Sequence, residues 1–135
     1  MPRNTIQPPQ LFRSQPWGFS QVTTCPPGTI VNIAGQVPWT ADNTVSAHGR
    51  EAQLRQVLAN VITAVEAAGG TADDIQILRL YMPDFQSGTE AEVVASVLRD
   101  VFGTDNPPAS SWIGVQALAQ PEYLVEAEAM AVVSG

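Results

Sequence analysis

Apolar residues recur along the chain with two different periods, which divide it into helices and strands. A helical pattern begins at about Gly49, and from Leu54 to Ala68 they recur every three or four positions over about four turns, which predicts an amphipathic helix. The apolar positions of this helix are Leu54, Val57, Leu58, Val61, Val65 and Ala68. Gly69 and Gly70 follow at once and indicate where the helix ends.

A second helix is predicted before Gly103 by the same spacing. Its apolar side carries Val94, Val97, Leu98 and Val101. Ser87, with Glu90 three residues later, is typical of a capping box and predicts the start of this helix. The stiff segment Asn106-Pro107-Pro108 follows as a loop.

Runs rich in β-branched and aromatic residues predict five strands, at residues 19–24, 29–37, 75–82, 109–118 and 123–133. The Pro-Pro-Gly turn at residues 26–28 predicts that the first two runs form a hairpin. Residues 1–17 contain four prolines and no period, so we expect an irregular arm before a single domain at residues 18–135. The order β-β-α-β-α-β-β predicts an α+β fold with a mixed sheet and both helices on one face.

The alternation along the last two strands predicts what each face of the sheet carries. In the last strand Glu126, Glu128 and Met130 would point away from the helices, because the residues between them are small and apolar. In the preceding strand, taken as its neighbour, Ser110 and Trp112 would lie on that same open face. Such a mixture is unusual in contact with water. We therefore expect copies of the chain to cover this face and to form pockets where they meet.

Composition and charge exclude several classes of function. The net charge is −7 and the six cationic residues are scattered arginines, which argues against binding to nucleic acid. The absence of lysine excludes Schiff-base chemistry. His48 and Cys25 are the only soft metal ligands and lie in separate predicted loops, so we expect neither a zinc site nor a catalytic dyad. Without a membrane span, a signal peptide or a possible internal disulfide, the cytoplasm is the expected location.

Four segments of the chain, in order, resemble the reactive intermediate deaminase family, also called Rid, YjgF or endoribonuclease L-PSP-like. They are Gly18-Phe19-Ser20-Gln21, Ala34-Gly35-Gln36-Val37-Pro38, the stretch from Asn60 to Gly69, and the C-terminal signature from Pro108-Ala109-Ser110-Ser111 to Glu126-Ala127-Glu128-Ala129. The resemblance spans residues 18 to 133. It implies a chorismate-mutase-like fold, a homotrimer with pockets at the subunit interfaces, and hydrolysis of enamines or imines without a metal or organic cofactor.

The chain departs from the family where an arginine usually binds the carboxylate of the substrate, because Ser110 occupies that position. Losing such a charge-assisted pair commonly costs about 2–5 kcal/mol. The resemblance therefore implies a small-molecule enzyme that is not a standard 2-imino acid deaminase. Trp112 on the same strand either adapts the pocket to a less charged, aromatic or cyclic ligand, or fills the space that the arginine left.

The resemblance, together with strand position for Trp112 and Tyr81, gives the candidate site residues. Glu128 is the expected catalytic residue, since hydrolysis of a C=N bond needs a group that positions and deprotonates water. The expected ligand-binding residues are Ser110, Trp112, Gly35, Phe19 and Tyr81. Arg79 could supply the missing positive charge, although pairing with a neighbouring carboxylate is the more common role. Two alternatives to the enzyme stay open: a non-catalytic protein that binds or senses a metabolite, and the ribonuclease with which the family is associated.

Overall fold

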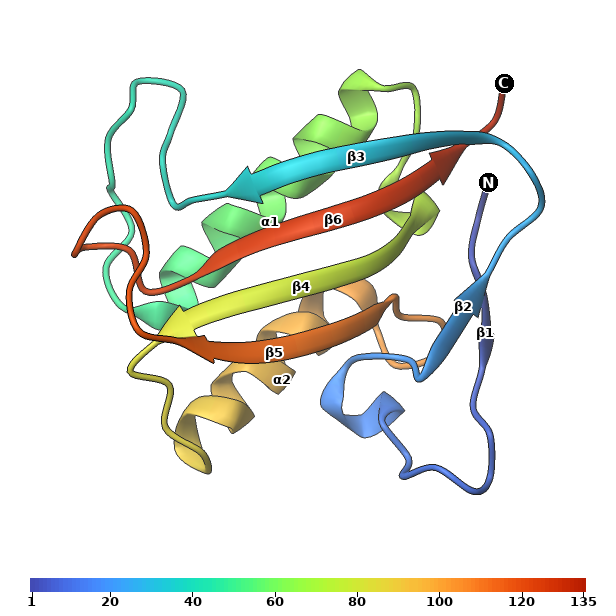
Figure 1. The fold of residues 1–135 in the computed structure, drawn as a ribbon, viewed down its shortest axis with the longest axis horizontal. Helices are drawn as coiled ribbons and strands as arrows, with labels where there is room; N and C mark the ends of the chain where they lie inside the picture. The colour runs from blue at the N-terminus through green and yellow to red at the C-terminus, as the bar shows by residue number, and fades with distance from the viewer.

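The computed structural model describes residues 1–135 as a four-stranded mixed sheet with two helices on one face (Figure 1). The strands of this sheet are β3 (Thr29–Gln36), β4 (Ile75–Pro83), β5 (Ala109–Val115) and β6 (Glu126–Val133), and the helices are α1 (Arg50–Ala67) and α2 (Thr89–Phe102). The strand order is β3-β6-β4-β5, with β4 and β5 parallel and the other pairs antiparallel. The predicted α+β class, and the placement of both helices on one face, are confirmed.

The N-terminal part of the chain forms a separate two-stranded ribbon beside the sheet (Figure 1). Its strands are β1 (Asn4–Ile6) and β2 (Val22–Thr24), and a 3-10 helix, η1 (Gln15–Trp17), lies between them. The expected hairpin of residues 19–24 with 29–37 is therefore wrong, because β2 pairs with β1 and β3 pairs with β6. The expectation of an irregular arm over residues 1–17 is also wrong for β1 and η1.

A buried arginine explains how this N-terminal segment is held in place. The guanidinium of Arg3 donates hydrogen bonds to the carbonyls of Ala72 at 2.8 Å, Ile75 at 3.2 Å and Asn106 at 2.6 Å. Burial lowers the pKa of Arg3. Three carbonyls that are far from Arg3 in the sequence thus share its one cation. This local network could not be inferred from the polar, proline-rich composition of the arm.

The ends of the two helices test the predicted helix signals. The glycine pair after α1 is confirmed as its stop, since the N–H of Gly69 and of Gly70 bond back to the carbonyls of Glu66 and Val65. The predicted capping box of Ser87 is wrong, because Gly88 is the N-cap of α2 and no side chain caps it. Glu90 instead accepts hydrogen bonds from the Arg50 guanidinium and from the N–H of Gln86.

The hydrophobic core lies between the sheet and the two helices. It contains most of the predicted apolar positions of both helices, including Leu54 and Leu98, packed on Leu78 and Leu80 of β4 and on the alanines of β6. Of the other predicted positions, Val101 is half-buried and Ala68, which follows the last residue of α1, is exposed. A short 3-10 helix, η2 (Ala72–Asp74), leads into β4. No helix has the length and apolar character needed to cross a membrane.

Candidate functional site

The strand register separates the predicted site residues into two groups on opposite faces of the sheet. Leu80 of β4 pairs with both Trp112 and Ala127, so Trp112 lies on the helix-covered face. Arg79 pairs with both Ser111 and Glu128, so these residues lie on the open face. The prediction that Ser110 and Trp112 share a face with Glu128 is therefore wrong within one chain. It assigned the faces of β5 from the polarity of its residues, whereas β5 is an edge strand that β4 separates from β6.

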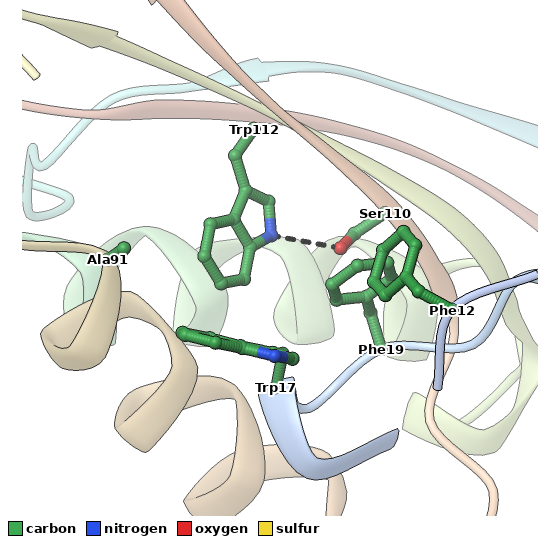
Figure 2. A pocket seen from close by; sticks show the side chains of 6 residues that line it. All are labelled: Phe12, Trp17, Phe19, Ala91, Ser110 and Trp112. Carbon is green, nitrogen blue, oxygen red and sulfur yellow. Dashed lines mark hydrogen bonds between the residues drawn. The ribbon is translucent and has the colours of Figure 1, made fainter. Parts of the chain in front are cut away.

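On the helix side, beside the edge strand β5, the chain forms a pocket of about 370 Å³ (Figure 2). Its lining residues are Phe12, Trp17, Phe19, Ala91, Ser110 and Trp112. They come from the N-terminal segment, from η1, from α2 and from β5. Segments far apart in the sequence thus meet at this one place, which includes three of the predicted ligand-binding residues.

Edge-to-face contacts connect the aromatic rings of this pocket in a chain. The ring of Trp112 is at its centre, with ring centroids 6.4 Å from Trp17 and 5.6 Å from Phe19. Phe12 continues the chain, 6.0 Å from Phe19. Such pairs stabilise their mutual orientation by about 0.5–1.5 kcal/mol each beyond the area that they bury. The pocket therefore has defined aromatic walls.

The family-like segment at residues 18–21 explains why the N-terminal rings lie beside β5. Gly18 has a left-handed backbone, with φ of 84°, and packs directly on α2 at Leu98. Buried Ser20 donates its hydroxyl to the carbonyl of Pro107 and its N–H to the carbonyl of Pro108. These contacts fix the residues on either side of Phe19, so the motif acts by positioning Trp17 and Phe19.

Ser110 is the one polar side chain among the lining residues. Its Oγ accepts a hydrogen bond of 3.1 Å from the indole N–H of Trp112 (Figure 2). No cationic or acidic side chain lines the pocket. Ser110, which the resemblance matches to the position of the family's arginine, therefore lines a pocket whose other side chains are aromatic or small and uncharged.

The open face carries a second cluster, built around a pair of glutamates on β6. The hydroxyl of Tyr81 donates a 2.5 Å hydrogen bond to Glu128, and this bond, with burial, raises the pKa of the phenol. Burial and the neighbouring charge of Glu128 raise the pKa of Glu126. Gly35, at the irregularity of β3, lies against the carboxylate of Glu126, where any Cβ would collide with it. The predicted residues Gly35, Tyr81 and Glu128 thus lie on the same face.

The remaining candidates have clear positions. Arg79 is exposed on the open face opposite Glu128, away from the aromatic pocket, and no ion pair of Arg79 is formed. Trp39 packs on Tyr123 outside the pocket. His48 and Cys25 line two different hollows, and no group of three or more acidic, histidine or cysteine side chains is arranged to hold a metal ion.

Sequence reasoning did not select Phe12 and Ala91. Phe12 lies in the segment expected to be irregular, and it is 65% exposed, so no hydrophobic period marks it. Ala91 is a single small residue in the first turn of α2. The contact of η1 with α2 brings Ala91 to the pocket, and the contact with Phe19 brings Phe12 there. No signal in the sequence reports either contact.

Comparison with known proteins agrees with this architecture. The sequence pattern of the family described as Endoribonuclease L-PSP matches residues 14–133. A Yersinia pestis protein of unknown function of the conserved Rid protein family, YyfB, is 39% identical with a TM-score of 0.88, over 98% of this chain and all of that one. Mycobacterium tuberculosis Rv2704, a member of the YjgF/YER057c/UK114 family, is 28% identical with a TM-score of 0.64, over 97% and 99%.

A third similar structure contains a ligand. Escherichia coli TdcF, solved with bound serine, is 27% identical with a TM-score of 0.66, over 82% of this chain and 85% of that one. The match of the family pattern covers most of the chain, and the four segments quoted above lie within or at the edges of the matched residues. The chain belongs to the Endoribonuclease L-PSP family, which is the Rid or YjgF family.

Proposed function

We propose that this chain is a small-molecule enzyme of the Rid family, which hydrolyses a C=N bond in an imine, an enamine or a related compound. The complete site is formed between copies in a homotrimer. The observation that carries the proposal is the division of the site into an aromatic pocket on one face and the Glu126–Glu128 pair on the other. A cyclic trimer has heterologous interfaces, each of which joins two different surfaces. Opposite faces of one chain can therefore meet across such an interface.

The chemistry assigned to the open face is activation of water. Glu128 accepts a proton from a water molecule, and the resulting hydroxide adds to the carbon of the C=N bond. Proton transfer to the nitrogen and cleavage of the C–N bond then release an amine or ammonia and a carbonyl compound. The hydrogen bond from Tyr81 to Oε1 of Glu128 fixes the carboxylate and leaves its other oxygen for the water.

The absence of a cation among the pocket residues supports a substrate other than a simple 2-imino acid. A carboxylate transferred into an uncharged aromatic pocket loses its hydration without gaining a guanidinium partner. Ser110 supplies a single hydroxyl and cannot replace the two parallel bonds of an arginine. We expect little acceleration of 2-aminoacrylate hydrolysis, and Ser110→Arg is the variant that would restore it.

The direct test is to measure carbonyl and amine release from a panel of neutral imines and enamines. Glu128→Gln should abolish turnover while the oligomer, measured by light scattering, survives. Glu122→Gln is the matched control, because Glu122 is an exposed glutamate in the loop before β6. Unchanged turnover in Glu128→Gln would remove the mechanism, and rapid hydrolysis of 2-aminoacrylate by the wild type would remove the argument from Ser110.

A non-catalytic metabolite-binding protein is the second candidate. The observation that favours it is that the aromatic pocket is lined by residues of one chain, none of which is titratable. In that case a ligand would raise the melting temperature by mass action, and no product would form during long incubation.

A further inference from the structure

Two features of the aromatic pocket restrict what it can bind. Its walls are four aromatic rings, and a volume of about 370 Å³ places it at the small end of the range of ligand pockets, about 300–1,000 Å³. A ligand of one or two fused rings would fill such a space. The edge-to-face arrangement around Trp112 leaves ring faces and edges for further stacking, which favours a flat ligand.

The hydrogen bond between Trp112 and Ser110 determines whether Ser110 donates or accepts a hydrogen bond toward a ligand. The indole N–H can only donate, so Ser110 Oγ is the acceptor of their 3.1 Å bond. The serine hydroxyl keeps its own hydrogen, and no group in the chain accepts it. Ser110 is therefore oriented by Trp112 to present one donor to a ligand.

The charges around the pocket disfavour an ionic ligand. An anion would meet no cation among the lining residues, in a protein of net charge −7. A cation would be attracted by the ring faces, but none of the residues that line the rings is a carboxylate, and the glutamates of the proposed site lie on the open face of another copy. A charged group that is buried without a partner is costly, so a neutral ligand is favoured over both.

We propose that this pocket selects a planar, uncharged ring bearing one hydrogen-bond acceptor, such as a carbonyl oxygen or an imine nitrogen, which the hydroxyl of Ser110 binds. The inference rests on the proposed function, because it takes the pocket as the place where the substrate ring is held. It places the bond to be hydrolysed on a conjugated ring or beside one. Trp112 is the specificity-determining residue, since it both stacks and orients the serine.

Three nearly isosteric probes test the charge and acceptor requirements: benzamide, benzoate and benzamidinium. Binding to the wild-type protein is followed by the indole N–H signals in nitrogen–proton correlation spectra, where Trp112 and Trp17 report the pocket and Trp39 is the internal control. We expect benzamide to shift the Trp112 signal and to bind about tenfold more tightly than either ion. Cyclohexanecarboxamide should bind more weakly than benzamide, because it lacks the flat ring.

Two serine variants separate the proposed contact from a general effect on the fold. Ser110→Ala should weaken benzamide about fivefold, as expected for one neutral hydrogen bond. Ser111→Ala is the matched control, since Ser111 is the next residue of β5, is exposed and faces the other side of the sheet, and it should not change the affinity. Benzoate or benzamidinium binding as tightly as benzamide, equal effects of the two serine variants, or no shift of Trp112 with any probe would overturn the proposal.

These outcomes are distinguishable from failure of the proposed enzyme. Probe binding requires no turnover, so the wild type should bind benzamide, with the Trp112 signal shifted, even if no imine is ever hydrolysed. Conversely, imine hydrolysis with a preference for benzoate in the binding experiment would refute the ligand class and leave the enzyme in place.

Discussion

We predict that Gly18 is essential for the packing of η1, which carries Trp17 of the pocket, on α2. The contacts at this position set the expected loss of stability in a Gly18→Ala variant. A Cβ at this position would lie 2.7 Å from the Cβ of Leu98 and 2.9 Å from the backbone N of Arg99. Neither atom belongs to the flexible end of a side chain, so η1 or α2 would have to move. Gly18→Ala should therefore displace η1, and with it Trp17.

Two costs contribute to the destabilisation by Gly18→Ala. The left-handed backbone costs an alanine about 1–2 kcal/mol. The collision with the helix adds about 1–3 kcal/mol, as expected for overpacking at a tightly packed contact. We therefore expect the free energy of unfolding to fall by about 2–5 kcal/mol, which corresponds to a melting temperature lower by roughly 7–18 °C for a domain of this size.

Gly69→Ala is the matched control for this prediction. Gly69 also has a positive φ, of 91°, but no atom lies within 4 Å of the position of its Cβ. This variant should lose only the backbone contribution, about 1–2 kcal/mol. Urea unfolding at one protein concentration measures both variants, since association would make the apparent stability depend on concentration. Equal losses in the two variants would refute the argument from the contact with α2.

Two further predictions concern ionisation on the open face. Because burial and Glu128 raise the pKa of Glu126, the native state holds the proton of Glu126 more tightly than the unfolded chain does. The contribution of protonated Glu126 to the free energy of unfolding is fully present below the unfolded pKa of about 4.3. It is lost as the pH rises through the folded pKa. Glu126→Gln should accordingly be at least as stable as the wild type at pH 7 and should lose any advantage near pH 4. Urea unfolding at several pH values measures this, and a stability difference between the two proteins that does not depend on pH would contradict the prediction. The hydrogen bond to Glu128 raises the pKa of Tyr81, so Glu128→Gln should make this phenol ionise at a lower pH in an ultraviolet titration. Tyr81→Phe identifies the signal of Tyr81, and the ionisation of Tyr123 should not change. An unchanged titration of Tyr81 would be evidence against that bond.

The helices and central strands could be predicted because their signals are local. A period of three to four residues located α1 and α2, and a dense apolar run located β4. The pairing of β2 could not be predicted in this way. Pro26-Pro27-Gly28 ends one strand and begins another, as expected, but the partner of β2 is β1, which is three residues long and has no apolar period.

The error about the site has a physical cause in the position of β5. In β6, which has neighbours on both sides, buried and half-buried residues alternate, and the alternation correctly identified the open face of Glu128. At the edge of the sheet β5 is partly exposed on both faces, and Ser111 and Ile113 are both exposed. Polarity along an edge strand thus does not report its faces. Only the register with β4 assigns Ser110 and Trp112 to the helix side.

Because the pocket and the Glu126–Glu128 pair lie on opposite faces of one sheet, no movement of side chains within a chain brings them together. A site that uses both must contain two copies, and mixing of variants tests this requirement. Glu128→Gln and Trp112→Leu should each form inactive homotrimers. After the two are unfolded together and refolded, about a quarter of the interfaces in a cyclic trimer would join an intact pocket to an intact Glu128.

The same arithmetic gives a second, independent test, in which the wild type is refolded with a double variant that carries both Glu128→Gln and Trp112→Leu. A site between copies predicts that about a quarter of the sites are intact, whereas a site within one chain predicts about half. For the two single variants, a site within one chain predicts no recovery at all. Activity in both mixtures near one quarter of the wild-type value would establish that neighbouring chains share the site. If activity is not recovered in the mixture of the two single variants, or when that mixture is repeated at higher protein concentration, the two faces do not act together.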